Sequence, residues 1–97
     1  MITVKTKYYA YLRELTGIRE EEITLSEGAT VLTLIEYLVK KYGASFKSYI
    51  LADNMGLKPS IVIAINGVKI SDDPLNRRLR DGDTLVILPP ISGGVNV

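Results

Sequence analysis

The sequence has 97 residues, 46% of them hydrophobic, and shows no break in composition. This is enough for one modest core, so we expect one folded domain. Twelve basic and eleven acidic residues leave a net charge of +1, which disfavours nucleic acid or an acidic membrane as a partner.

Two residue types are missing, and their absence excludes several kinds of chemistry. The chain has no cysteine, which excludes disulfides, thiolate metal sites and iron–sulfur ligation. It also has no histidine, which removes the usual general base at neutral pH and any Ser-His-Asp triad. The N-terminus lacks the pattern of a signal peptide, and no apolar run approaches the roughly 18 residues of a membrane span. We therefore expect a cytoplasmic protein without a membrane partner.

The first predicted elements are a strand and a short helical turn. Apolar and polar residues alternate over residues 2–9, the pattern of a strand with one solvated face. Leu12 and Leu15 then lie three residues apart before Gly17, which predicts a helical turn closed by a glycine. We assign the three tyrosines of this region to packing rather than to a platform for nucleic acid bases, namely Tyr8, Tyr9 and Tyr11.

A run of three acidic residues, 20–22, precedes a second short alternating strand over residues 23–25. We interpret the carboxylates as a solvated strand edge whose charge discourages pairing with another sheet edge. They do not predict a metal site, because adjacent strand residues point to opposite faces of a sheet.

The main helix is predicted over residues 31–42, where apolar residues recur at spacings of three and four. Thr30 is placed to cap its N-terminus. Gly43 follows two lysines and a tyrosine, which is typical of a helix C-terminus. A chain of this size has one core, so we expect the apolar stripe of this helix to cover the sheet.

The second half contains a loop and a hairpin. Residues 44–59 show little periodicity and predict a turn or a short helix within a loop. Residues 59–65 predict a strand, and Asn66 and Gly67 predict a type I′ turn into a hairpin with residues 68–70. Three arginines are expected on a solvated surface, with contact to an acidic patch of a partner as the alternative, namely Arg77, Arg78 and Arg80.

The last strand is predicted over residues 85–88, an unbroken apolar run that indicates burial on both faces. We place it beside the first strand and parallel to it, with the main helix as the crossover. The predicted fold is therefore of the α+β class: a β-grasp with a mixed sheet of four to five strands and one main helix packed across it. The β-grasp domain covers residues 1–90, and residues 91–97 form a C-terminal tail.

The tail begins at a proline pair that cannot donate hydrogen bonds to a sheet, Pro89 and Pro90. Six residues from Pro89 to Gly94 can span roughly 20 Å, enough to place the backbone inside another protein. Glycine has no Cβ, so Gly93 and Gly94 can enter a narrow channel. We therefore predict that the segment before Gly94 binds partners, through Pro89, Pro90, Ile91, Ser92 and Gly93.

Several segments, in their order and spacing, resemble the MoaD/ThiS-type ubiquitin-like sulfur carriers, among which the small subunit of molybdopterin synthase is the closest match. The matching segments are residues 8–10, 12–17, 29–31, 64–67, 79–83 and 88–94. The resemblance implies that an ATP-dependent activating enzyme adenylates the C-terminal glycine, Gly94, which then becomes a thiocarboxylate that donates sulfur in molybdenum cofactor biosynthesis. It also implies a large synthase subunit into which the tail inserts. The carrier itself would be non-catalytic and would bind no cofactor or metal.

One feature departs from this pattern, because Val95, Asn96 and Val97 follow Gly94. Either a processing protease removes these three residues, or the chain is never activated. Two other functions stay open: a ubiquitin-like protein modifier or tRNA-thiolation carrier that uses the same Gly94, and an uncleaved β-grasp binding module.

Overall fold

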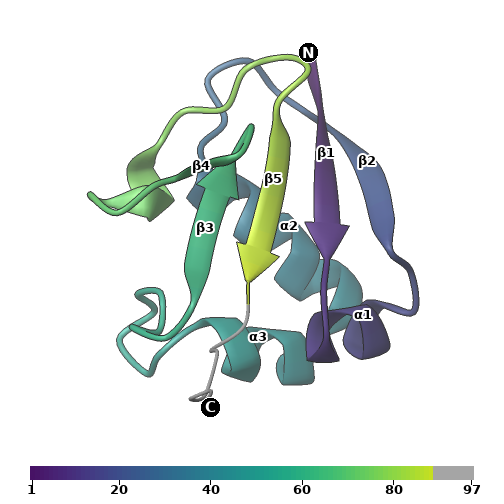
Figure 1. The fold of residues 1–97 in the computed structure, drawn as a ribbon, viewed down its shortest axis with the longest axis vertical. Coiled ribbons are helices and arrows are strands. Elements are labelled where there is room, and N and C mark those ends of the chain that lie inside the picture. The colour runs from purple at the N-terminus through teal and green to yellow at the C-terminus, as the bar shows by residue number, and fades with distance from the viewer. Residues whose placement is uncertain (89–97) are drawn as a thin grey trace.

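A five-stranded mixed sheet carries helices on one of its faces (Figure 1), in a computed structural model that describes residues 1–88. The strands are β1 (Ile2–Tyr8), β2 (Glu20–Leu25), β3 (Val62–Ile65), β4 (Val68–Lys69) and β5 (Thr84–Leu88). The helices are α1 (Tyr11–Thr16), α2 (Val31–Tyr42) and α3 (Ala44–Ile50), and a 3₁₀ turn covers Pro74–Asn76. The spatial order of the strands is β2-β1-β5-β3-β4.

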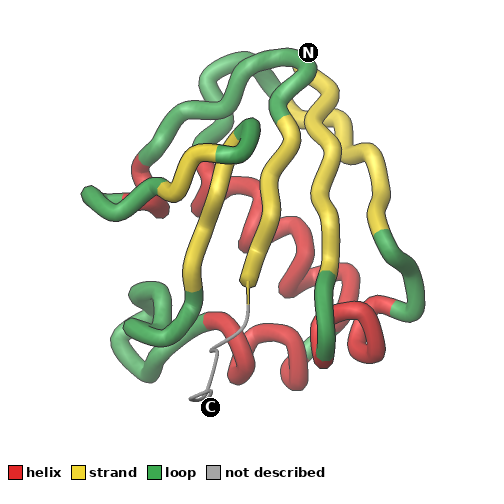
Figure 2. Tube along the Cα trace, in the orientation of Figure 1, coloured by secondary structure: helices red, strands yellow, loops and turns green. Residues whose placement is uncertain are grey.

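The centre of the sheet is a parallel pair formed by β1 and β5, the first and last strands of the chain. Their register places Lys5 opposite Thr84 and Tyr8 opposite Ile87. β2 pairs antiparallel with β1, and β3 pairs antiparallel with β5. Helix α2 crosses behind these strands (Figure 2). The predicted β-grasp arrangement, including the parallel placement of the last strand, is therefore confirmed.

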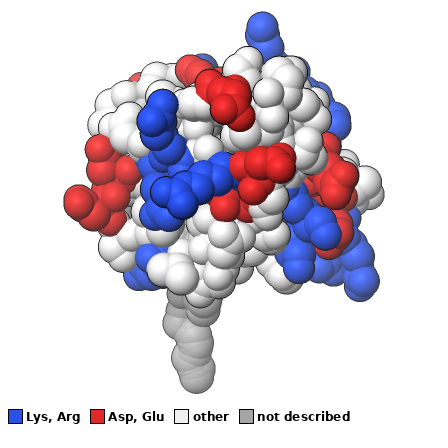
Figure 3. All heavy atoms as spheres, turned by 90° about the horizontal axis from the view of Figure 1, so that it is seen from above, with Lys and Arg blue, Asp and Glu red and all other residues white. Residues whose placement is uncertain are grey.

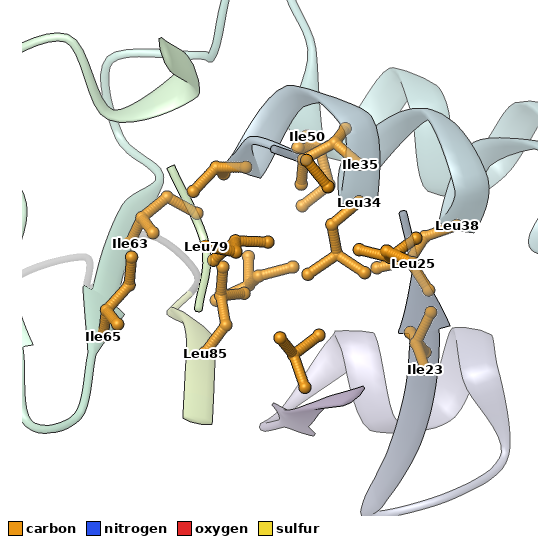
Figure 4. Packing of buried hydrophobic residues seen from close by; sticks show 14 of the residues in the cluster. Ile23, Leu25, Leu34, Ile35, Leu38, Ile50, Ile63, Ile65, Leu79 and Leu85 are labelled. Atoms are coloured by element: carbon orange, nitrogen blue, oxygen red, sulfur yellow. The ribbon is translucent and has the colours of Figure 1, made fainter. Parts of the chain in front are cut away.

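The hydrophobic core lies between the sheet and α2 (Figure 4). The predicted stripe of α2 faces this core, and four of its side chains are buried: Val31, Leu34, Ile35 and Leu38. Figure 4 shows Leu34, Ile35 and Leu38 among side chains of β2, β3 and β5, with Ile50 of α3 beside Ile35 and the loop residue Leu79 close to Leu85. The core is thus built from one face of the sheet only.

The predicted ends of α2 are confirmed. The Thr33 amide donates to the side-chain oxygen of Thr30 at 3.3 Å, and the Thr30 amide donates to the Thr33 side chain at 3.1 Å. This reciprocal pair is a capping box. At the other end, the Gly43 amide donates to the carbonyl of Val39 at 2.8 Å.

The predicted type I′ hairpin is also confirmed, because Asn66 and Gly67 both have positive φ, 52° and 83°. The Asn66 side chain has a second role. It donates to Asp83 and accepts from the Thr84 amide, both at 2.9 Å. The turn is therefore tied to the residues that begin β5.

One prediction about secondary structure needs correction. β5 is not buried on both faces: Leu85 and Ile87 are fully buried, whereas Val86 and Leu88 are half-buried. The reason is that, within residues 1–88, helices cover one face of the sheet only. The short helix that was one alternative for residues 44–59 is present as α3, whose Phe46 and Ile50 are buried.

The assignment of three tyrosines to packing holds for Tyr8, which is buried, and for Tyr11, whose ring packs on that of Tyr49 with centroids 5.0 Å apart, but none of the three rings except Tyr8 belongs to the core. Tyr9 is 39% exposed and Tyr11 is 46% exposed. Between them, Ala10 has φ 52° and ψ −128°. This backbone region suits glycine, and a residue held in such a sparsely populated conformation costs about 1–3 kcal/mol.

The three arginines are exposed, as predicted. They lie on an extended segment whose backbone is fixed to the start of α2, since Val31 donates to Arg77 and Leu79 donates to Ala29, both at 2.9 Å. Seen from above, this end of the molecule carries basic groups near its middle with acidic groups on either side (Figure 3). The mixed charge is that of an ordinary solvated face, and contact with an acidic partner there stays a prediction.

We expect Thr30→Ala to lower the free energy of unfolding by about 1 kcal/mol, because the Thr33 amide loses its acceptor. Thr30→Ser keeps the hydroxyl and is expected to retain most of that stability. Urea denaturation of the two variants and the parent chain measures the difference. If both variants lost the same free energy of unfolding, the effect would come from the threonine methyl group and not from the cap.

Candidate functional site

The residues predicted to carry the chemistry lie outside the part of the chain that the structure describes. These are Pro89, Pro90, Ile91, Ser92, Gly93 and Gly94, together with Val95, Asn96 and Val97. The structure does place the residue from which this segment starts, Leu88, at the end of β5. Leu88 is therefore the base of the predicted site.

The base of the tail is held by the neighbouring strands. Ile87 lies in register with Tyr8 of β1 and with Ile63 of β3, and Leu88 lies in register with Val62 of β3. Because β5 is the central strand, Ile87 is paired on both sides, whereas Leu88 is paired with β3 only. The last described residues of the chain are therefore fixed by the neighbouring strands.

The face of the sheet turned away from the helices carries an apolar strip beside the end of β5. Val62 lies opposite Leu88, and Ala64 lies opposite Val86. Each alternates with a buried neighbour along its strand, so all four side chains belong to the open face, and all four are half-buried. Figure 1 views the sheet from this side, with α2 behind it. We call these four residues the open-face strip.

Lysines border the open-face strip on both sides. Lys7 of β1 lies in register with Val86, and Lys69 of β4 lies in register with Ala64. Lys5, further along β1, pairs with Glu20 at 3.4 Å. The strip is therefore an apolar surface with a basic border, a combination that suits a partner with an apolar patch and acidic groups around it.

A polar cluster ties the sheet to α2 near the same end of the molecule. The Glu21 carboxylate accepts hydrogen bonds from the hydroxyl groups of Tyr8, at 2.7 Å, and Tyr42. It also pairs with the Lys41 ammonium group at 2.6 Å. These contacts join β1, β2 and the last turn of α2.

The interpretation of the whole acidic run as a solvated edge is wrong for Glu21, whose side chain is 11% exposed. Strand β2 begins at Glu20 and includes the entire run. Because alternate strand residues share a face, Glu21 lies on the side of Ile23 and Leu25, which point into the core. The alternation of faces along β2 can be read from the sequence. The partners of the Glu21 carboxylate cannot, because they lie on β1 and α2.

The cluster shifts the pKa values of its members. Burial raises the pKa of Glu21, but the hydrogen bonds from Lys41, Tyr42 and Tyr8 favour its charged form more strongly, so the pKa lies below its ordinary value. Burial, and then the hydrogen bond to Glu21, raises the pKa of Tyr42 to about 12. The same two causes raise the pKa of Tyr8. The carboxylate therefore stays ionised and both phenols stay neutral near pH 7.

Residues 1–88 contain neither a cluster of metal ligands nor a membrane-spanning helix. Among residues 1–88, no group of three or more acidic side chains is arranged to hold a metal ion. No helix in the same range is long and apolar enough to cross a membrane.

Comparison with known proteins places the chain in a family. A model of the ThiS family matches residues 6–94. The chain belongs to the ThiS family. This finding confirms the resemblance predicted from the short motifs, and the matched region ends at the second glycine of the tail, Gly94.

Relatives of this ThiS-family chain are similar over nearly their whole length. The molybdopterin synthase sulfur carrier subunit of Drosophila yakuba is 29% identical over 96 residues, which are 97% of this chain and 93% of the relative. A solved structure of a putative molybdopterin converting factor, subunit 1, from Pyrococcus furiosus is 36% identical, with a TM-score of 0.75 and coverage of 94% and 100%. Small archaeal modifier protein 1 from Methanosarcina acetivorans is also 36% identical, with a TM-score of 0.77 and coverage of 97% and 98%.

The Glu21 cluster generates a prediction about pH. Because the folded-state pKa of Glu21 is lowered, its contribution to stability is complete above the ordinary value of 4.5 and is lost as the pH falls through the folded-state pKa. We expect Glu21→Gln to lower the free energy of unfolding by about 1–2 kcal/mol at pH 7.

The difference in unfolding free energy between the parent chain and Glu21→Gln should shrink as the pH falls below the ordinary value of 4.5 and through the lower folded-state pKa. Chemical denaturation at several pH values measures it. Glu22→Gln is the matched control, since Glu22 is exposed on the opposite face of β2. A difference that stays constant over this pH range would show that the charge of Glu21 contributes nothing.

Proposed function

We infer that this chain is the sulfur carrier subunit of a molybdopterin synthase, with Gly94 as the residue that carries sulfur. The observation that carries this proposal is the family match over residues 6–94, which ends at the second glycine. The relatives named as molybdopterin synthase sulfur carrier subunits support it. The central position of β5 adds a physical reason, because it gives the tail a rigid base.

The proposed chemistry takes place at the carboxyl group of Gly94. A carboxylate is a poor electrophile and must first be activated. Its oxygen attacks the α-phosphorus of ATP on the activating enzyme, which forms an acyl adenylate and releases pyrophosphate. Hydrosulfide supplied by a sulfur-transferring enzyme then attacks the carbonyl carbon, so that a C–S bond forms, the C–O bond to AMP breaks and AMP leaves. The product is a thiocarboxylate, and no oxidation or reduction is involved.

The chain itself supplies geometry and no catalytic group. A glycine at the reacting position leaves both faces of its carbonyl accessible to two different enzymes. We propose accordingly that the chain is not an enzyme, and that ATP belongs to the activating enzyme and is not a bound cofactor of the carrier. We also propose that the carrier acts in the cytoplasm.

A free carboxyl group at Gly94 requires removal of Val95, Asn96 and Val97. A processing protease is therefore part of the proposal. Backbone at a chain terminus is a common site of proteolysis. Without this cleavage the adenylation step has no substrate.

Two proteins would receive the tail in turn: the activating enzyme and the large subunit of the synthase. The open-face strip, together with Ile91 of the tail, is the proposed docking surface for them. Its position beside the end of β5 supports this, because a partner that holds the tail would also meet the strip.

A second candidate function uses the same reactive glycine. The chain is 36% identical to small archaeal modifier protein 1 from Methanosarcina acetivorans. This likeness favours a protein modifier as the alternative, in which a lysine of another protein attacks the activated Gly94. A tRNA-thiolation carrier would differ only in the sulfur acceptor. An uncleaved β-grasp binding module is the alternative of another class.

Intact-mass measurement tests the proposed function. We expect protein isolated from its native cells to lack Val95 to Val97. We expect a variant that ends at Gly94, after incubation with the activating enzyme, a sulfur source and ATP, to gain about 16 Da as sulfur replaces oxygen. The matched control, in which Gly94 is also changed to valine, should gain nothing.

Each failure in this experiment has a separate meaning. A native protein that always keeps Val97 would favour the binding module. A truncated variant that is loaded with sulfur but is found attached to lysines in cells would favour the protein modifier.

The docking surface yields a separate prediction. Val86→Thr replaces one methyl group of the open-face strip by a hydroxyl of similar shape, and a buried hydroxyl without a partner should weaken binding to the large subunit about tenfold. Val68→Thr is the matched control, because Val68 is exposed on the β4 edge outside the strip. Calorimetric titration of each variant measures the affinity, and equal affinities would exclude Val86 from the interface.

A further inference from the structure

The turn between β1 and α1 is strained without an evident internal reason. Ala10 has φ 52° and ψ −128°, where glycine would fit better. The turn is closed by the Leu12 amide, which donates to the Tyr9 carbonyl at 3.1 Å. Ala10 is exposed, so its side chain gains little from packing within the chain. Strain that is kept at an exposed position is typical of a residue with a functional role.

Two exposed tyrosines flank this strained residue. Tyr9 and Tyr11 are 39% and 46% exposed, although each carries a large apolar ring. Tyr11 packs on Tyr49 of α3, with ring centroids 5.0 Å apart. Tyrosines held in one orientation offer contact area at a low entropic cost and are enriched in protein interfaces.

Arg13 completes this group. Its guanidinium carbon lies 5.9 Å from the centroid of the Tyr9 ring. Its Nε is buried and has no hydrogen-bond partner among residues 1–88. Within residues 1–88 no carboxylate forms an ion pair with it. A guanidinium group that lies over a ring and is partly removed from water binds a planar anion strongly, because its N–H groups form a fixed fork.

The position of this group relates it to the tail. Tyr8, the last residue of β1, lies in register with Ile87, one residue before the end of β5. The ends of β1 and β5 point toward the same end of the molecule (Figure 1). Tyr9, which follows β1 directly, and Arg13 of α1 therefore lie at the end of the molecule where β5 ends.

We propose that Arg13, oriented by Tyr9, binds an aspartate or glutamate side chain of the synthase large subunit when that subunit receives the tail. This inference rests on the proposed function. The planar guanidinium group of Arg13 matches the geometry of a carboxylate. The exposed rings of Tyr9 and Tyr11 offer apolar surface around it. The strained turn at Ala10 fixes the positions of these three side chains. Lys7 and Lys69, which border the open-face strip, also favour negatively charged groups on the partner.

Two other roles explain Tyr9, Tyr11 and Arg13 less well. Packing in the core does not explain the two tyrosines, because both are exposed. A platform for nucleic acid bases would need an organised basic surface, and the chain has a net charge of only +1.

The test measures the affinity of the large subunit for the chain ending at Gly94, with variants at Arg13. Arg13→Gln removes the charge, and Arg13→Lys keeps the charge but removes the fork. We expect Arg13→Gln to weaken binding by roughly 10-fold to 100-fold, because it removes a charge-assisted contact at the interface. We expect Arg13→Lys to weaken binding by at least about fivefold. Arg19→Gln is the matched control for the loss of charge, because Arg19 is exposed in the loop before β2, and it should stay within about twofold.

Thermal unfolding of each variant separates binding from folding, and all midpoints should match that of the parent chain. Parent-like binding by Arg13→Gln would overturn the inference and leave the proposed function standing. Parent-like binding by Arg13→Lys would overturn the forked contact, since a point charge would then suffice. If the parent chain itself forms no complex with the large subunit, both the inference and the proposed function fail.

Discussion

The parallel pairing of β1 with β5 is the constraint on which the rest of this structure depends. Two parallel neighbours cannot be joined by a tight turn, so the chain between them must cross over one face of the sheet, and α2 is that crossover. The crossover covers one face and creates the core. The other face is left without a layer within residues 1–88, which is why the open-face strip exists.

The same pairing concentrates the functional features at one end of the molecule. β1 and β5 run in the same direction, so the turn after Tyr8 and the tail after Leu88 leave the sheet as neighbours. The Glu21 cluster ties β1, β2 and α2 together close to that end. A carrier whose reactive atom lies on a thin segment needs such a rigid base, because a fixed starting point reduces the entropy that is lost when an enzyme orders the segment.

The proposed function divides the chain into parts with different physical tasks. In this proposal the tail carries the reactive carbonyl, and the domain supplies the surface that partners recognise. Separating the two lets different enzymes act on one atom in turn while using the same exposed surface. Membership in the ThiS family and the similarity to molybdopterin synthase sulfur carrier subunits agree with this division.

The sequence by itself determined the features that depend on local periodicity and turn chemistry. These include α2 with its Thr30 cap, the Asn66–Gly67 hairpin, the strand that precedes the tail, and the glycine pair itself. Only the tertiary structure decided the burial of Glu21, the exposure of Tyr9 and the half-exposed face of β5. The physical reason is that burial depends on what packs against a residue. The partners of Glu21 come from β1 and α2, and the exposure of Val86 depends on how many layers cover the sheet, which an apolar run of four residues cannot indicate.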